Sequence, residues 1–337
     1  MFMKALSFVI PAYNTEDTIL RCLDSIYASG LDDADFEVVV IDDCSTDKTF
    51  RIASDYASTH SNMIVKRHSS NLKPGACVNL GVETASGQYI QFVGADDMIS
   101  QSIVRALEQA VKWDVDCQLN AFSVEIQKGQ HEILGSEYKT GVCITGEEFC
   151  DKVFDAKIQF CAGPLFLWKR DFIISIYRRA VEGRYYEDTD WIEYMLPRAE
   201  RVTFFNEPVY KCLYTPSSIT HRTKDMVIMT DYLLMQIRRL ENTLCCEIAT
   251  YNAKIERYCK GEIKKFLRLR NVSKYPFKQL KYLYKSLTKD NYRKMRNFDF
   301  GIQANWFFRC RRSWLTAMFF MCRPAMVGRS IVAKMRG

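Results

Sequence analysis

The chain has 337 residues, enough for one large domain and an appendage, and its 48% hydrophobic and 26% charged residues are ordinary for a globular protein. No run of about 18 apolar residues occurs, so we expect no membrane-spanning helix. The thirteen cysteines include no C-x-x-C pair, which indicates neither a zinc site nor a disulfide framework. Scattered thiols favour a reducing compartment, and we expect the cytoplasm.

Charge is divided unevenly along the chain. Residues 1–222 carry a net charge of −10, whereas residues 223–337 carry +17. Such asymmetry predicts a basic C-terminal region that meets an anionic partner, either a membrane or a nucleic acid. We therefore expect two parts, a domain over 1–222 and a basic, mainly helical region over 223–337.

Strands and helices alternate through the first hundred residues. Apolar, β-branched runs predict strands at Leu6–Ile10, Glu37–Ile41, Met63–Arg67 and Tyr89–Val93. Apolar residues at helical spacing predict helices that begin at Thr15 or Glu16 and near Thr46, and another over Ala76–Ala85. Four alternations with short connections predict an α/β fold, a parallel sheet with helices on both faces.

Two of these strands end in adjacent aspartates, Asp42–Asp43 and Asp96–Asp97. The carboxyl ends of parallel strands share one edge, where ligands bind in open α/β sheets. Carboxylate oxygens suit Mg²⁺ or Mn²⁺, which in turn neutralise phosphates. Alternatively, Asp96 or Asp97 caps the helix expected near Ser100. The chain contains neither G-x-G-x-x-G after the first strand nor a P-loop, which argues against dinucleotide-binding and P-loop folds.

Five motifs in order resemble those of the family 2 glycosyltransferases. They are Phe8–Asn14, Val40–Asp47, Asn71–Gly81, Ala85–Ile90 and Ala95–Asp97, and the resemblance covers roughly residues 4–222. It implies the GT-A fold, which is Rossmann-like, with a mostly parallel sheet and helices on both faces. It also implies an inverting transfer from a nucleotide-activated sugar, with Mn²⁺ or Mg²⁺ as cofactor.

The resemblance further implies roles for individual residues. Those expected to bind the donor are Pro11, Tyr13, Asp42, Asp43, Ser45, Lys73, Asn79 and Asp97, with Asp96 as the metal ligand. Asp43 suits a base N–H or a sugar hydroxyl as an acceptor, and Tyr13 offers a stacking face. The chain departs from the family at three positions: Gly94 replaces the first Asp of D-x-D, Val78 the usual Arg, and Cys44 the usual Gly.

Two more acids, Glu187 and Asp188, stand among aromatic residues at 184–191. The resemblance implies that this pair carries the catalytic base, with Asp188 ahead of Glu187. Alternatively, Asp188 or Thr189 caps a helix over Trp191–Leu196. His221 is a candidate metal or diphosphate ligand, and the other interpretation is an ordinary histidine. Upstream, a helix over 101–113 and a strand pair at 116–125 and 131–134 are expected, and downstream a closing strand at 205–214.

The C-terminal region reads as helices at 226–244, 255–269 and 277–287, followed by large aromatics mixed with arginines over 305–323. That mixture is typical of a helix in a membrane interface. A helix packed on the catalytic domain and a dimer contact are the alternatives. No nucleic-acid partner is expected, because no reading motif accompanies the charge.

The resemblance implies a hexosyl- or N-acetylhexosaminyl-transferase that moves a sugar from a nucleotide-diphosphate donor, foremost a UDP-sugar, to a glycan or lipid-linked glycan. Cell-surface polysaccharide synthesis is the expected setting, with the enzyme cytoplasmic and peripheral at the inner face of the membrane. Gly94 and Val78 keep open a non-catalytic nucleotide-sugar-binding or scaffold protein of the same fold. Sugar-1-phosphate nucleotidyl transfer is disfavoured, because no glycine-rich basic loop follows Ile10.

Overall fold

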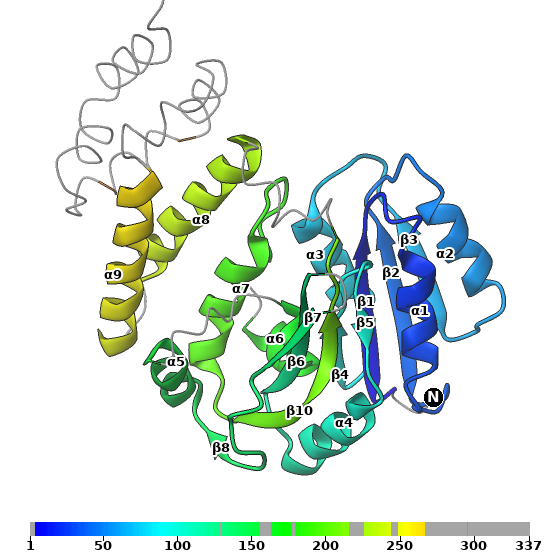
Figure 1. Cartoon of the computed structure of the whole chain (residues 1–337), viewed down its shortest axis with the longest axis horizontal. Helices are drawn as coiled ribbons and strands as arrows, with labels where there is room; N and C mark the ends of the chain where they lie inside the picture. Colours follow the sequence, from blue (N-terminus) through cyan, green and yellow to red (C-terminus); the bar gives the residue numbers. More distant parts are fainter. Residues whose placement is uncertain are drawn as a thin grey trace, which may run out of the picture. The chain divides into compact units, whose positions relative to one another are not determined.

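The structure is a computed structural model that describes residues 4–127, 130–155, 163–176, 179–215, 226–243 and 249–266, with residues 287 and 295 (Figure 1). The chain divides into two compact units, Met1–Ser218 and Ile219–Gly337, and each is described by itself. The first unit contains a ten-stranded mixed sheet, whose main strand order is β3-β2-β1-β4-β9-β6-β10-β5.

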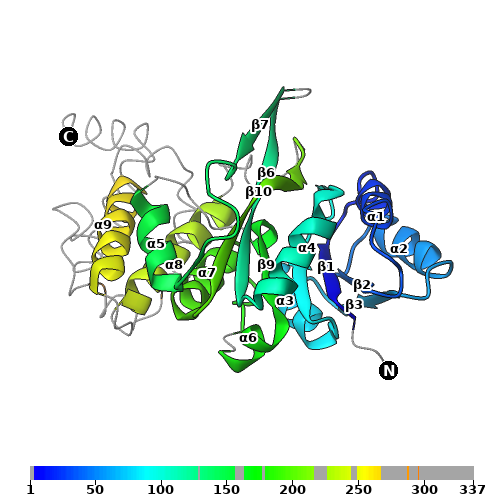
Figure 2. The same ribbon diagram turned by 90° about the horizontal axis from the view of Figure 1, so that it is seen from below.

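The amino-terminal half of the sheet is parallel, as the alternation predicts. Its strands are β1 (Leu6–Ala12), β2 (Phe36–Asp42), β3 (Met63–Arg67) and β4 (Tyr89–Phe92). The helices between them are α1 (Ile19–Tyr27), α2 (Thr49–Ala57) and α3 (Pro74–Thr84). Because parallel crossovers are right-handed, α1 and α2 lie on one face of the sheet and α3, which returns to β4, lies on the other (Figure 2). β1 pairs with both β2 and β4, so their carboxyl ends meet at one edge.

Two helices begin later than their spacing predicts, because local polar contacts hold the chain in turns first. The Thr15 carbonyl accepts from the N–H groups of Thr18 and Ile19, and α1 begins only at Ile19. The Thr46 N–H donates to Asn14 Oδ1 at 2.8 Å, and α2 begins at Thr49. These turns place the loops after β1 and β2 side by side.

The carboxyl-terminal half of the sheet is mixed, and the expected GT-A fold with a mostly parallel sheet is confirmed. β9 (Phe166–Lys169) runs antiparallel to both β4 and β6 (Cys117–Gln127). β10 (Val202–Cys212) is parallel to β6, while β5 (Met98–Ile99) and β8 (Cys143–Ile144) pair with it antiparallel. β7 (Gln130–Leu134) forms the expected strand pair with β6, and Figure 2 shows this hairpin extending past the sheet.

The helices of this half are α4 (Ser102–Trp113), α5 (Gly146–Asp155), α6 (Arg170–Ser175) and α7 (Glu187–Met195). Aromatic packing fixes α7 on the sheet. Trp191 packs edge-on against Trp168 of β9, with ring centroids 5.4 Å apart, and against Phe92 of β4, with centroids 5.6 Å apart. Edge-to-face pairs of this kind prefer defined geometry, so they anchor α7 next to β4.

The second unit contains α8 (Met226–Thr243) and α9 (Ala249–Phe266), close to the predicted helices there. Tyr232 of α8 donates to Glu262 of α9 at 2.9 Å. In the part of the chain that the structure describes, no helix combines the length and apolar character needed to cross a membrane. The aromatic and arginine-rich segment at 305–323 lies outside the described residues.

Candidate active site

The carboxyl ends of β1 and β2 bring the first predicted site residues together. Pro11 pairs with Ile41 in the parallel register, and the Asp43 N–H donates to the Ala12 carbonyl at 2.8 Å. Tyr13 follows directly and is 45% exposed. The predicted nucleobase residues therefore lie on adjacent loops of one edge.

Asp42 is fully buried and organises its own loop. Its Oδ2 accepts from the Ser45 N–H at 3.1 Å and forms an ion pair with Arg67, whose Nε lies 3.1 Å away. Ser45 Oγ accepts from the Asn14 N–H at 3.0 Å, which ties the two loops together. Among the described residues, Asp42 Oδ1 has no hydrogen-bond partner. A buried carboxylate with one oxygen unpaired retains acceptor capacity.

Asp43 joins β2 to the loop before α3. Its Oδ1 accepts from the Leu72 N–H at 2.8 Å and lies 3.0 Å from His68 Nδ1, and its Oδ2 accepts from the Lys73 N–H at 2.8 Å. Both oxygens are thus held by groups that follow β3. The orientation of this carboxylate depends on the conformation of residues 68–73.

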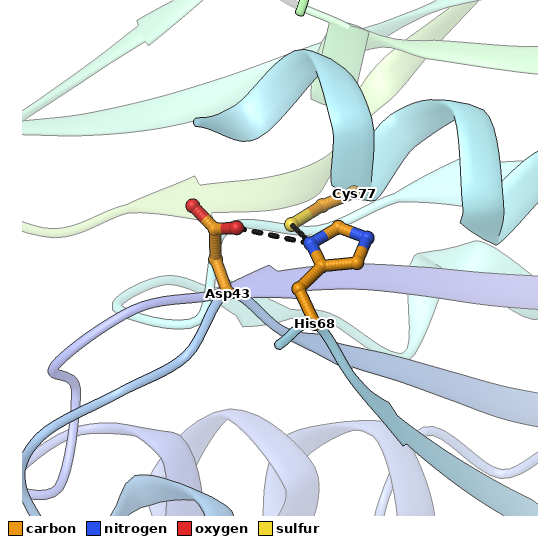
Figure 3. A group of neighbouring side chains, drawn as sticks. All are labelled: Asp43, His68 and Cys77. Atoms are coloured by element: carbon orange, nitrogen blue, oxygen red, sulfur yellow. Dashed lines mark hydrogen bonds and ion pairs between the residues drawn. The ribbon is translucent and has the colours of Figure 1, made fainter. Parts of the chain in front are cut away.

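Asp43, His68 and Cys77 form a cluster that sequence reasoning missed (Figure 3). Their ligand atoms all lie within 4.8 Å of one another, and Cys77 Sγ is 3.9 Å from His68 Nδ1. One carboxylate, one imidazole and one thiol are a ligand set that Zn²⁺ accepts. The same positions are accounted for by hydrogen bonds, however, and burial with nearby carboxylates raises the pKa of the Cys77 thiol. We therefore do not assign a metal ion to this cluster.

Asn79, expected at the donor, is buried and bonded to the segment before α7. Its Oδ1 accepts from the Ala180 N–H at 2.8 Å, and its Nδ2 donates to the Ala180 carbonyl at 3.0 Å and to Glu182 at 2.9 Å. The Gly183 N–H donates to the Leu72 carbonyl at 2.8 Å. These bonds fasten residues 180–183, which precede α7, to α3 and to the loop that holds Asp43.

Backbone strain gathers at the same edge. Among the described residues, the non-glycine residues with positive φ are Asn14, Cys44, Lys73, Asp114 and Tyr186. All but Asp114, which ends α4, belong to the loops just described or to the start of α7. Residues held in such conformations gather at functional sites, because the surroundings must over-determine them. Cys44, where the family usually has Gly, is one of them, with a φ of +61°.

The second pair of aspartates stands between β4 and β5. Asp97 is 9% exposed, and it accepts from the Tyr210 hydroxyl and, at 2.8 Å, from the Leu213 N–H. Burial, and then the charge of Asp96, raises the pKa of Asp97 to about 7. α4 begins after Gln101 without a side-chain cap, so the alternative of an aspartate cap is wrong.

Asp96 is only partly buried, and burial raises the pKa of its carboxyl while the nearby Arg21 lowers it. A Cβ at Gly94 would lie 2.9 Å from Asp97 Oδ2 and 3.1 Å from Asp96 Oδ1. The glycine thus leaves room for both carboxylates where the family's first aspartate would stand. Carboxylate oxygens such as those of Asp96 suit a hard cation such as Mn²⁺ or Mg²⁺. His221 lies outside the described residues.

Glu187 and Asp188 occupy the first turn of α7, which begins earlier than the predicted helix. Its cap position is Tyr186, with a φ of +62°, so neither Asp188 nor Thr189 is the cap. Glu187 is buried, and its Cγ lies 3.3 Å from where a Cβ at Gly75 would be. Asp188 is partly exposed and accepts from the Thr189 N–H at 2.9 Å. Burial raises the pKa of Asp188 to about 6, which leaves it ionised at neutral pH.

An α/β sheet with carboxylates and strained loops at the carboxyl edge is typical of nucleotide-binding proteins. Residues 7–176 match the model of Glycosyl transferase family 2, and the chain belongs to this family. The described fold agrees with solved structures of such enzymes. A crystal structure of Staphylococcus aureus TarS, fragment 1–349 in complex with UDP-GlcNAc, has a TM-score of 0.68 at 18% identity and covers 96% of this chain and 92% of that one.

The matches to curated relatives cover smaller shares of both chains. The poly(ribitol-phosphate) beta-glucosyltransferase of Bacillus spizizenii is 31% identical over 170 residues, which cover 50% of this chain and 25% of the relative. The uncharacterized glycosyltransferase YibD of Escherichia coli is 25% identical over 219 residues, 64% of this chain and 63% of that one. The chain therefore spans less than two thirds of each of these relatives. A Pyrobaculum calidifontis mannosyltransferase in complex with GDP-Man and Mn²⁺ has a TM-score of 0.53 at 14% identity, covering 97% of this chain and 87% of that one.

Proposed function

We propose that the protein is an inverting glycosyltransferase that moves a hexosyl or N-acetylhexosaminyl group from a UDP-sugar to a glycan or lipid-linked glycan in cell-surface polysaccharide synthesis. One observation carries the proposal. The segment that bears Glu187 and Asp188 is bonded, through Gly183, to the loop whose backbone holds Asp43. A nucleotide at Asp43 and an acceptor at Asp188 would therefore be organised by the same contacts.

Binding of the donor falls to the loops after β1, β2 and β3. Asp43 accepts from the base or ribose, Tyr13 stacks on the base, and Asp42 with Ser45 keeps these loops in register. Asp96 would hold Mn²⁺ or Mg²⁺, which would neutralise negative charge on the departing diphosphate. The Mn²⁺ complex of the mannosyltransferase relative and the UDP-GlcNAc complex of TarS support these choices.

Asp188 takes the role of general base. The acceptor oxygen forms its bond to the anomeric carbon while the bond from that carbon to the diphosphate oxygen breaks, and the diphosphate keeps that electron pair. The hydroxyl proton passes to Asp188, whose pKa of about 6 leaves it ionised yet basic enough near neutral pH. Attack from the face opposite the leaving group inverts the configuration.

Release of UDP from UDP-glucose and UDP-GlcNAc in the presence of Mn²⁺ tests the enzyme against a binding or scaffold protein. Poly(ribitol phosphate) belongs among the acceptors tried, because the relative from Bacillus spizizenii acts on it by name. We expect donor turnover that an acceptor accelerates. Tight UDP-sugar binding with no turnover on any acceptor would support the scaffold instead.

We also propose that residues 300–337 hold the enzyme on the cytoplasmic face of an anionic membrane. Aromatic side chains would insert and arginines would supply attraction, each worth about 1 kcal/mol near such a surface. They include Trp306, Phe307, Trp314, Arg311 and Arg312. Flotation of the full chain with anionic and with neutral liposomes tests this, and charge reversal at Arg311 and Arg312 should weaken it. Equal flotation on both liposomes would contradict the electrostatic part.

A further inference from the structure

Lys73 has a backbone conformation that is almost exclusive to glycine. Its φ is +72° and its ψ is 167°. A Cβ is strained in this region, whereas glycine adopts it without cost. A lysine here is therefore less favourable for folding than a glycine would be.

Contacts on both sides impose this conformation. The N–H groups of Leu72 and Lys73 both donate to Asp43 at 2.8 Å, the Leu72 carbonyl accepts from Gly183, and Pro74 begins α3. The loop is thus fixed at its start, its middle and its end. The Lys73 side chain leaves the loop in a direction that the backbone has set.

The ammonium group of Lys73 meets a neutral partner. Nζ donates to the Tyr185 hydroxyl at 3.1 Å and lies 4.8 Å from the centre of the Tyr185 ring. Within the described part of the chain, no carboxylate forms an ion pair with Lys73. An ammonium has three N–H donors, so two remain for other oxygens. Tyr185 orients the charge without neutralising it.

We propose that Lys73 binds the diphosphate of the donor and makes the site selective for a nucleoside diphosphate over a nucleoside. This inference rests on the proposed function. Lys73 lies between Asp43, where the nucleobase is expected, and the segment of Asp188, where transfer is expected, and the diphosphate joins those two parts of the donor. Lysine is a compact point charge that suits phosphate oxygens. Tyr185 holds it in place before the donor arrives.

The test compares Lys73→Gly with the wild-type full chain in two measurements, calorimetric titration with UDP and with uridine, and thermal unfolding without ligand. Glycine removes the charge but relieves the backbone. We therefore expect UDP affinity to fall about 10-fold or more, as for loss of a hydrogen bond to a charged group. Uridine affinity should stay unchanged, and the unfolding midpoint should rise. Lys73→Arg should keep most of the UDP affinity.

Lys66→Ala is the matched control. Lys66 Nζ also donates to a hydroxyl group, that of Thr84 at 2.9 Å, but Lys66 belongs to β3 and not to the loop of Lys73. It should change neither affinity. Unchanged UDP affinity in Lys73→Gly would overturn the inference. An equal loss for UDP and uridine, or a lower unfolding midpoint, would also overturn it and show that Lys73 only supports the Asp43 loop. If wild-type protein binds no UDP, the proposed donor fails, and this inference with it.

Discussion

Two of the chain's pairs of adjacent acids, Asp96–Asp97 and Glu187–Asp188, are alike in sequence and opposite in structure. In the pair after β4, the first acid, Asp96, is partly exposed and the second, Asp97, is buried. In the first turn of α7 the order is reversed, since Glu187 is buried and Asp188 partly exposed. Neighbouring side chains point in different directions on either backbone, so each pair offers one acid to solvent and one to the interior.

The buried member of the β4 pair acts within the fold. Tyr210 and Leu213 donate to the two oxygens of Asp97. These bonds connect the loop after β4 to the end of β10 and to the residue that follows it. The members that are partly exposed are Asp96 and Asp188. The comparison shows that two acids next to each other in the sequence do not necessarily share one chemical role. We expect the partly exposed acid of each pair to act on the ligands, and the variants below test that division.

The largest effect is expected from Asp188→Asn. A general base contributes about 10²–10⁴-fold, so turnover should fall by that order while UDP-sugar affinity changes little. Steady-state transfer rates and calorimetric donor titration measure the two quantities. Glu187→Gln is the matched control and should be milder. A dead Glu187→Gln beside an active Asp188→Asn would reverse the roles, and a collapse of donor binding in Asp188→Asn would make its role structural.

Asp96→Ala should lower the transfer rate less than Asp188→Asn does, and its main effect should be on donor affinity. Removal of a metal ligand should lower UDP-sugar affinity in Mn²⁺ by at least the roughly 10–100-fold that a group supporting a metal ligand contributes. In EDTA the variant and the wild type should bind equally. Calorimetric titration in both buffers gives the comparison. If the wild type binds equally in Mn²⁺ and EDTA, donor binding does not depend on a metal at Asp96.

The strand-end acids could be predicted from sequence because each follows a recognisable buried strand. Asp43 and Asp96 belong to contiguous motifs, and the parallel pairing of β1 with β2 and β4 puts both at one edge. The antiparallel strand β9 could not be predicted in the same way. It inserts between β4 and β6 from a position far along the chain, and its sequence reads as any apolar strand.

Contacts between distant segments were also out of reach. Asn79 and Ala180 are 101 residues apart, and nothing in either segment signals the bonds between them. His68 and Cys77 meet Asp43 only because the loop folds back on the end of β2. The strained backbone of Lys73 is invisible as well, since lysine carries no preference for positive φ.

The pH dependence of transfer sharpens the assignment of Asp188. A general base works only when ionised, and burial raises the pKa of Asp188 to about 6. The kcat/KM of transfer should therefore be flat above that pH and should fall about tenfold per pH unit below it. Initial rates from about pH 4.5 to about 8 at limiting acceptor concentration measure this. If Asp188→Asn shows the same fall in rate at acidic pH, the group that titrates is not Asp188.

The smallest effect is expected from Asp97→Asn, and it is an effect on stability. Asp97 has a pKa of about 7 in the folded chain, against about 3.9 for an unfolded aspartate. Between these values the folded state binds a proton that the unfolded state lacks, so the free energy of unfolding falls as pH rises from about 4 to 7.

Asparagine can still accept from Leu213 and meet the Tyr210 hydroxyl, but it carries no charge to bury. In EDTA the variant should therefore be more stable than the wild type at pH 8, by on the order of 1 kcal/mol, and about equal at pH 5. For a domain of this size, that is about 2–4 °C in the unfolding midpoint. A variant less stable than the wild type at pH 8 would mean that the hydrogen bonds to the ionised carboxylate outweigh the cost of burying its charge. The contrast between Asp97 and Asp96 would then be one of partners rather than of burial.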